Sequence, residues 1–258
     1  MFTNDDIKQI EQRGSSVPVV KEQVERFKKG FPWMKIVAPA TPQRGILVLD
    51  DAAVEAAGKY YETSQINGKC KFVPASGAAS RMFKDLFSFL SADYDVPTND
   101  FEKKFFEHID KFAFYGDLND ACIKNKSLSI KELVEKGMYK DVVFNLLDFT
   151  GMNYGSLPKG LLKFHTYDDA ARTSAEEHFV EGALYAATNG VVKLHFTVSP
   201  NHKALFEELV AECKERYEAL FGVKYDITFS EQKQCTDTIA ADADNAPFRE
   251  NGALVFRP

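Results

Sequence analysis

Hydrophobic residues recur along this chain at either helical or strand spacing. Segments of the two kinds alternate most regularly in the C-terminal half. A helical spacing over 173–188 stops at Asn189-Gly190, and an alternating run predicts a strand over 191–198. A second helical pattern ends at Gly222 and leads to a strand over 224–230. Because strands separated by helices pair in parallel, the pattern predicts a wound parallel sheet. The other expected strands, all short, span 34–38, 46–49, 237–241 and 253–256.

The N-terminal part of the pattern is helical and polar. We expect helices over 3–13 and 17–29, the second capped by Ser16, and we interpret residues 1–30 as an N-terminal arm. Asp50 or Asp51 then caps an alanine-rich helix that continues to about residue 64. An α/β domain is expected over 31–258.

A stretch of purely helical character interrupts this domain. Over 92–150 the apolar residues recur at helical spacing, Phe101, Phe105, Ile109 and Phe112 among them, and no strand is predicted. We expect these residues to form a helical insert that packs as a lid or subdomain beside the sheet. Its aromatic stripe is interpreted as core.

Composition limits the class of protein. The chain has 258 residues, 45% of them hydrophobic and 27% charged, and no apolar run near the ~20 residues that span a bilayer. The N-terminus lacks the pattern of a signal peptide, so a cytoplasmic protein without a membrane partner is expected. A net charge of −6 disfavours nucleic acid but permits a small anion held by local cations. The four cysteines are too far apart to predict a zinc site or a disulfide frame.

One loop has the character of a phosphate-binding loop. An apolar strand over 71–75 is followed by Ser76, Gly77, Ala78, Ala79 and Ser80, and a helical pattern opens at Arg81. Such a loop directs backbone N–H groups and a helix N-terminus toward one point, which suits phosphate. It lacks the Gly-Lys-Ser/Thr of a Walker A loop and the three glycines of a dinucleotide loop. The alternative is an ordinary turn in which Ser76 or Ser80 caps the helix and Arg81 is solvated.

A second candidate is the lysine of Pro158-Lys159-Gly160. The proline restricts the backbone before Lys159, and the glycine after it permits close approach of another group. Lys159 is therefore a candidate point charge for phosphate. The alternative is a solvated loop lysine.

Together the two stretches resemble the sugar-phosphate nucleotidyltransferase superfamily. Its signature is a strand, a loop of the form Gly-x-Gly-Thr/Ser-Arg-Met/Leu, and later a Pro-Lys before an apolar run. The chain has Gly77-Ala78-Ala79-Ser80-Arg81-Met82 and Pro158-Lys159-Gly160-Leu161-Leu162. It is still more similar to an uncharacterised bacterial family of unknown function. The resemblance implies a three-layer, mostly parallel α/β sheet of the nucleotide-diphospho-sugar transferase type.

The resemblance also implies roles. Residues 76–80 would hold the phosphates and ribose of a nucleoside triphosphate, Arg81 would neutralise the departing pyrophosphate, and Lys159 would hold the attacking sugar phosphate or the α-phosphate. Gln232, after the strand over 224–230, would contact the base or the sugar; an exposed loop glutamine is the alternative. His178 is interpreted as a residue of the helix start.

Three departures from the superfamily pattern bear on activity. Ala79 stands where a second glycine is usual, so its methyl group is expected to hold the phosphates further out. The superfamily uses Mg²⁺ held by an aspartate, whereas Asp242 and Asp244 are interpreted here as a solvated turn. The chain stops at Pro258 directly after an apolar strand. We therefore expect it to be truncated at its C-terminus in comparison with other members of the family.

Three functions are consistent with this pattern. The first is transfer of a nucleotidyl group from a nucleoside triphosphate to a sugar phosphate. The second is a non-catalytic module that binds nucleotide or phosphosugar. The third is a glycosyltransferase of the same fold that would use Asp242 and Asp244 for its metal.

Overall fold

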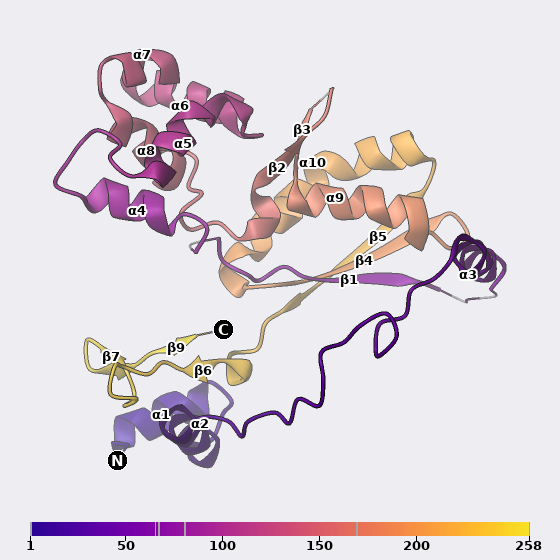
Figure 1. The fold of residues 1–258 in the computed structure, drawn as a ribbon. Coiled ribbons are helices and arrows are strands. Elements are labelled where there is room, and N and C mark those ends of the chain that lie inside the picture. The colour runs from indigo at the N-terminus through magenta and orange to yellow at the C-terminus, as the bar shows by residue number, and fades with distance from the viewer. Residues whose placement is uncertain (1, 65, 67, 80, 169, 258) are drawn as a thin grey trace. The chain divides into compact units, whose positions relative to one another are not determined.

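A three-stranded parallel sheet forms the framework of residues 67–232 in the computed structural model, which describes residues 2–64, 66, 68–79, 81–168 and 170–257 (Figure 1). The strands are β1 (Cys70–Pro74), β4 (Val191–Val198) and β5 (Lys224–Glu231), in the order β1-β4-β5. Both pairings are parallel, with Pro74 opposite Thr197 and Val198 opposite Glu231. The predicted parallel pairing and the strands predicted over 191–198 and 224–230 are therefore confirmed.

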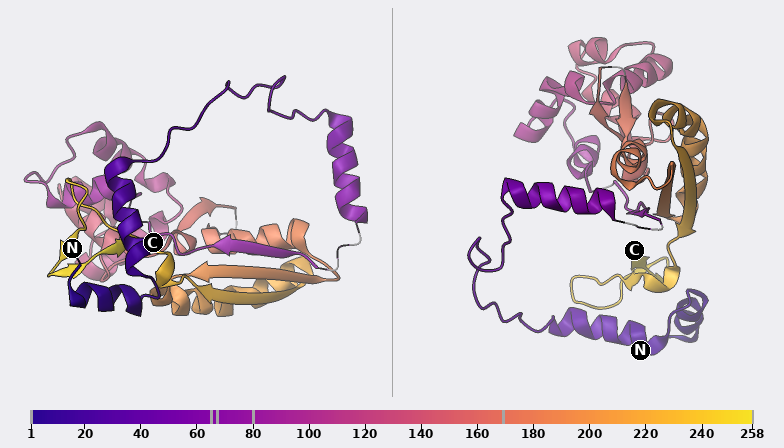
Figure 2. Two further views of the ribbon diagram at one scale, coloured as in Figure 1. Left: turned by 90° about the horizontal axis from the view of Figure 1, so that it is seen from below. Right: turned by 90° about the vertical axis from the view of Figure 1, so that its right-hand side faces the viewer.

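One face of this sheet is apolar and carries helices. The residues of β4 alternate in burial, and its buried set is Val192, Leu194, Phe196 and Val198. They share a core with residues of α9 (Ser174–Glu181) and α10 (Lys203–Phe221), which lie on the same face in Figures 1 and 2. A π-helical turn, η3 (Gly182–Ala186), extends α9 toward β4. The mixed α/β class is confirmed, whereas the three-layer arrangement stays a prediction.

Residues 92–150 form the expected helical insert, and none of them belongs to a strand. Its helices, together with α4 (Lys84–Ser91), are α5 (Asp100–Glu107), η1 (Ile109–Lys111), α6 (Tyr115–Lys126), α7 (Ile130–Glu135) and α8 (Tyr139–Leu147). Asn99 and Ser129 begin α5 and α7 with capping boxes. The core of the insert also takes in Ala79 of the first candidate loop, together with Phe83 and Leu162, which follow the two loops along the chain. The loops are therefore anchored in the insert as well as in the sheet.

A short hairpin connects the second candidate loop to the sheet helices. The single-turn helix η2 (Lys159–Leu161) leads into β2 (Lys163–Thr166), which pairs antiparallel with β3 (Ala171–Thr173). Thr173 then begins α9 with a capping box to Glu176. This hairpin was not predictable from the pattern, because strands of four and three residues are too short to show alternation.

The second unit consists of residues 1–66 and 233–258. Its elements are α1 (Asn4–Gln12), α2 (Val17–Lys29), α3 (Asp51–Thr63), η5 (Gln234–Thr236), β6 (Thr238–Ile239), β7 (Arg249–Glu250), β8 (Ala253–Leu254) and β9 (Phe256–Arg257). Ile10 and Val20 of the first two helices share a small core with Ile239 and Leu254. The predicted N-terminal helices are present, and they pack with the C-terminal strands.

Several local expectations for this unit are corrected. Residues 34–38 and 46–49 form no strand, and their large apolar side chains are exposed, with Val37 at 85% and Leu47 at 84%. The strand expected over 253–256 is divided between β8 and β9, which pair with different partners. Ser16 occupies the N-cap of α2 without a side-chain hydrogen bond. Asp50 does cap α3, accepting from the backbone N–H of Ala53 at 2.8 Å.

None of the helices in the described part of the chain is both long and apolar enough to cross a bilayer.

Candidate functional site

The two candidate loops lie against each other. Ala78 and Pro158 form an isolated antiparallel bridge. The backbone N–H of Lys159 donates to the carbonyl of Gly77 at 3.0 Å, and that of Ala79 donates to the carbonyl of Leu157 at 3.3 Å. We call residues 75–79 and 157–160 the loop junction. The structure therefore joins the two stretches from which the resemblance was drawn.

The loop junction presents backbone donors to solvent. Gly77 and Ala78 are exposed and Ser76 is half-buried. Within the described residues, the N–H groups of Ser76, Gly77 and Ala78 donate no hydrogen bond. Successive unpaired N–H groups at the end of a strand are a typical anion-binding arrangement. Lys159 is exposed beside them and makes no ion pair with another described residue, so its charge is available to a ligand.

Ala79 has a structural role in this arrangement. Its backbone N–H is already bonded to Leu157, and its side chain is fully buried in the core of the helical insert. The expectation that its methyl group holds phosphates away from the loop is therefore not supported, because the methyl group faces hydrocarbon. Residues 76–78 remain as the predicted backbone donors.

The predicted position of Arg81 at a helix N-terminus is corrected. Residues 81–83 form a turn, and α4 begins at Lys84. Arg81 is exposed and lines an open surface hollow with Lys84 and Phe87, whereas Lys159 lines a different cavity. Ser80, which was predicted to bind phosphate, lies outside the described residues. The structure therefore brings Lys159, but not Arg81, into contact with the loop backbone.

A small cavity lies next to the loop junction. Its volume is about 120 Å³, and Gly77, Lys159 and Gly160 line it together with Ser174 and His178 of α9. The rest of its wall is mainly apolar: Val73, Pro74, Ala75, Ala175, Phe196 and Phe206. Burying a phosphate among hydrocarbon would be strongly unfavourable. The lining of this cavity therefore does not suit a phosphate.

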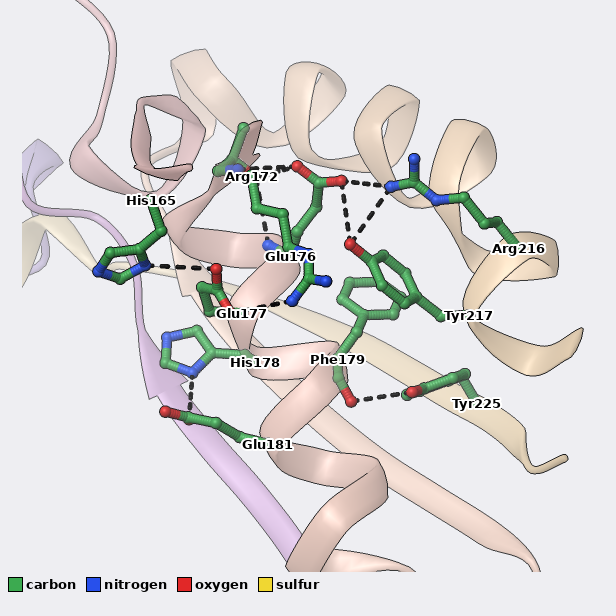
Figure 3. A network of polar contacts seen from close by, with 11 residues as sticks. His165, Arg172, Glu176, Glu177, His178, Phe179, Glu181, Arg216, Tyr217 and Tyr225 are labelled. Atoms are coloured by element: carbon green, nitrogen blue, oxygen red, sulfur yellow. Dashed lines mark hydrogen bonds and ion pairs between the residues drawn. The ribbon is translucent and has the colours of Figure 1, made fainter. Parts of the chain in front are cut away.

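His178 lies within a polar chain on the edge of this cavity. Its Nδ1 is 3.2 Å from Oε2 of Glu181, as Figure 3 shows. Glu181 also pairs with Lys71, whose side chain contacts the hydroxyl of Tyr185. Hydrogen bonding from Lys71 lowers the pKa of Glu181, and burial lowers the pKa of His178. Burial thus disfavours the charged form of His178, which lies within α9, in agreement with its interpretation as a helix residue.

The carboxyl ends of the three parallel strands meet at one edge of the sheet. Gln232 directly follows β5, and its backbone N–H donates to the carbonyl of Val198 at 2.9 Å. Ala75 at the end of β1 donates to Thr197 at 2.7 Å. Gln232 and the loop junction therefore lie at the same edge, where ligands of open α/β sheets bind.

A polar pair that the sequence did not predict also lies at this edge. Ser199 Oγ is 2.7 Å from Nδ1 of His202, directly after β4. Burial lowers the pKa of His202. The signal available was a Ser-x-x-His spacing at the end of a predicted strand, which is too common to be specific.

The described residues do not fit a metal held by the protein alone. No group of three or more His, Cys, Asp or Glu side chains is assembled in the described ranges. Asp242 Oδ1 instead accepts backbone hydrogen bonds from Asp244 (2.9 Å) and Ala246 (2.8 Å), as expected for a turn. The described side chains therefore do not form the aspartate-held Mg²⁺ site that the resemblance implies.

These features define a mixed α/β protein with a loop of unpaired backbone donors and an exposed lysine at the carboxyl edge of a parallel sheet. The chain belongs to the DUF4301 family, a domain of unknown function, whose model matches residues 3–258. No curated protein and no solved structure matches the chain. The resemblance to nucleotidyltransferases thus depends on the two sequence motifs alone.

Proposed function

We propose that this protein transfers a nucleotidyl group from a nucleoside triphosphate to a sugar phosphate at the loop junction. The observation that supports the proposal is the contact between residues 77–79 and 157–159, through two backbone hydrogen bonds. That contact places the Lys159 backbone next to three unpaired backbone N–H groups. Fixed N–H donors and a cation together bind phosphate oxygens in preference to neutral groups.

The proposed reaction needs little covalent chemistry from the protein. An oxygen of the sugar phosphate attacks the α-phosphorus of the nucleotide, the bond between that phosphorus and the α–β bridging oxygen breaks, and pyrophosphate leaves with the electron pair. The attacking phosphate is already an anion, so no side-chain base is required. Residues 76–78 and Lys159 would hold the phosphates in line and offset their charge. Arg81 is assigned to the leaving pyrophosphate by the resemblance alone.

The test is release of pyrophosphate from a panel of nucleoside triphosphates and sugar 1-phosphates, supplied with Mg²⁺ as the counter-ion of the nucleotide. We expect Lys159→Ala to lower kcat/KM about a hundredfold, because one charge-stabilising donor is typically worth that much. Lys193→Ala, at an exposed lysine of β4, is the matched control and retains the wild-type rate. Turnover that persists unchanged in Lys159→Ala contradicts the mechanism, and unchanged turnover in Arg81→Ala removes Arg81 from it.

The second candidate function is a non-catalytic module that binds nucleotide or phosphosugar. It is favoured by two observations: no metal-ligand cluster is assembled in the described ranges, and Arg81 lines a hollow separate from that of Lys159. A thermal shift on addition of nucleotide that is lost in Lys159→Ala, with no pyrophosphate released from any substrate pair, would select this function.

A further inference from the structure

A larger cavity, of about 480 Å³, opens on the helical insert. Its volume lies in the range of about 300–1,000 Å³ that is usual for small-molecule sites. The buried part of its wall is entirely apolar or aromatic: Phe83, Leu86, Phe105, Phe114, Tyr154 and Leu162. None of these residues lines the small cavity at the loop junction. The two cavities are therefore separate candidate sites.

Aromatic side chains continue from the wall of this cavity to its mouth. Phe101 and Phe112 line it and are 43% and 39% exposed. The Phe112 ring stacks on Phe114 with centroids 5.0 Å apart, and its centroid lies 5.4 Å from that of Phe105. Rings held by such contacts are preorganised, so an apolar ligand would gain contact area at little cost in side-chain order.

The polar part of the lining is basic. Lys104, His108, Lys111 and Lys163 line the cavity, and no acidic residue does so. Lys163 is neutralised by Asp117, with Nζ 2.7 Å from Oδ2. Lys104 and Lys111 form no ion pair within the described ranges, and Nζ of Lys111 lies 3.3 Å from Nδ1 of His108. Two uncompensated ammonium groups therefore stand beside an aromatic slot in a chain whose net charge is −6.

We propose that this cavity binds a small amphiphilic anion, a single apolar chain that carries a carboxylate. The chain occupies the aromatic slot, and the carboxylate lies between Lys104 and Lys111. The concave shape and the limited volume favour a single soluble molecule over the surface of a bilayer. This site is independent of the proposed nucleotidyl transfer, since it shares no lining residue with the loop junction.

Isothermal titration with sodium decanoate tests the proposal, with decanol and decyltrimethylammonium as the neutral and cationic counterparts. We expect saturable binding of one decanoate per chain. Decanol should bind roughly tenfold more weakly, because it lacks the charge that two partly exposed lysines recognise. The ammonium compound should show no saturable binding.

Two variants locate the site, each with a matched control. Lys104→Met with Lys111→Met keeps the apolar stems, removes both charges, and should weaken decanoate binding roughly tenfold. Lys103→Met, an exposed lysine on the same helix α5, should leave it unchanged. Phe101→Ala should weaken decanoate binding at least as much as the double lysine variant does. Its control is Phe144→Ala, which should leave binding unchanged, because Phe144 is similarly exposed (42%) on α8 but does not line the cavity.

Three results would overturn the proposal. The first is equal affinity for decanoate and decanol. The second is decanoate binding that none of these substitutions changes, in variants whose denaturant midpoints equal that of the wild type and which are therefore folded. The third is binding to vesicles of anionic phospholipid, lost in the double lysine variant, without binding of monomeric decanoate. Lys104 and Lys111 are exposed, so their double variant should fold normally. It therefore still tests the proposal if Phe101→Ala fails to fold.

Discussion

Gly160 is more closely surrounded than Gly77, the other glycine of the loop junction. A Cβ atom built on Gly160 would lie 2.7 Å from Cζ of Phe206, a ring that is itself buried against the sheet. At Gly77, across the junction, a Cβ atom would meet nothing within 4 Å. The two glycines of the junction therefore differ in the space around them, although both are typical of a phosphate loop.

We expect Gly160→Ala to lower the free energy of unfolding by about 1–3 kcal/mol, because overpacking forces a buried ring to move. Gly77→Ala is the matched control and should change it by less than about 0.5 kcal/mol. Urea denaturation followed by circular dichroism measures both. Equal midpoints for the two variants would contradict the close contact between Gly160 and Phe206.

Individual residues of the candidate site were predictable only in part. The motifs predicted that residues 76–80 and Lys159 share a site; residues 77–79 contact residues 157–159 in the loop junction, and Ser80 lies outside the described residues. They did not predict that Ala79 faces the core or that α4 begins three residues after Arg81. A motif states residue types and their order. Which side of the backbone is buried depends on the packing of the helical insert, a set of contacts between residues distant along the chain.

Helices α9 and α10 are joined by a polar network around the buried carboxylate of Glu176 (Figure 3). Its Oε1 accepts from Nη2 of Arg216 at 2.5 Å and from the hydroxyl of Tyr217 at 3.2 Å, while Oε2 accepts from the backbone N–H of Thr173 at 2.8 Å. Burial raises the pKa of Tyr217 to about 12, so its hydroxyl stays a donor at neutral pH. The start of α9 is therefore fixed by its capping box and by α10.

We expect Glu176→Gln to lower the free energy of unfolding by about 2 kcal/mol, because it removes the charge from several hydrogen bonds of a buried acceptor. Glu212→Gln, at an exposed position of α10, should have no measurable effect. Thermal and urea unfolding at pH 7 provide the comparison. If Glu176→Gln were as stable as wild type, the network would orient α9 against α10 without contributing to the free energy of unfolding, contrary to this prediction.

Elements with a long, regular pattern were predictable, and short ones were not. The eight residues of β4 were predicted as a strand, and α10, of nineteen residues, ends at Phe221 directly before Gly222, whose φ of 64° suits glycine. By contrast, the apolar residues at 34–38 suggested a strand that the structure lacks. A run of β-formers becomes a strand only when a partner strand pairs with it, and sequence pattern does not show the partner.

The two ends of the chain belong to one unit, and ion pairs between Arg13 and Asp237 and between Asp6 and Arg249 join them. The guanidinium of Arg249 donates to both carboxylate oxygens of Asp6, each at 2.7 Å, and Asp6 is 3% exposed. Thr3 adds a backbone hydrogen bond to the same carboxylate at 2.7 Å. Two parallel donors from arginine form one of the stronger charge-assisted contacts in proteins. The Arg249 side chain holds the pKa of Asp6 well below its ordinary value of 3.8.

This pair should make the stability of the unit depend on pH. A carboxyl group whose pKa is lowered on folding stabilises the folded state above its ordinary pKa, and the contribution is lost as the pH falls toward the pKa of the folded state. We expect Asp6→Asn to lower the free energy of unfolding by about 2 kcal/mol at pH 7. The difference from wild type should shrink progressively below pH 3.8. Urea denaturation at several pH values measures it.

Asp5→Asn is the control for this experiment, because Asp5 precedes Asp6 on α1 with a side chain that is 96% exposed. Its nearest cation, Lys8, is 4.0 Å away at the surface, where ion pairs contribute little. The control should therefore follow the wild-type curve at every pH. If Asp5→Asn and Asp6→Asn lowered stability equally, the effect would come from charge near the start of α1. A loss confined to Asp6→Asn, and matched by Arg249→Met, would attribute it to the pair between Asp6 and Arg249.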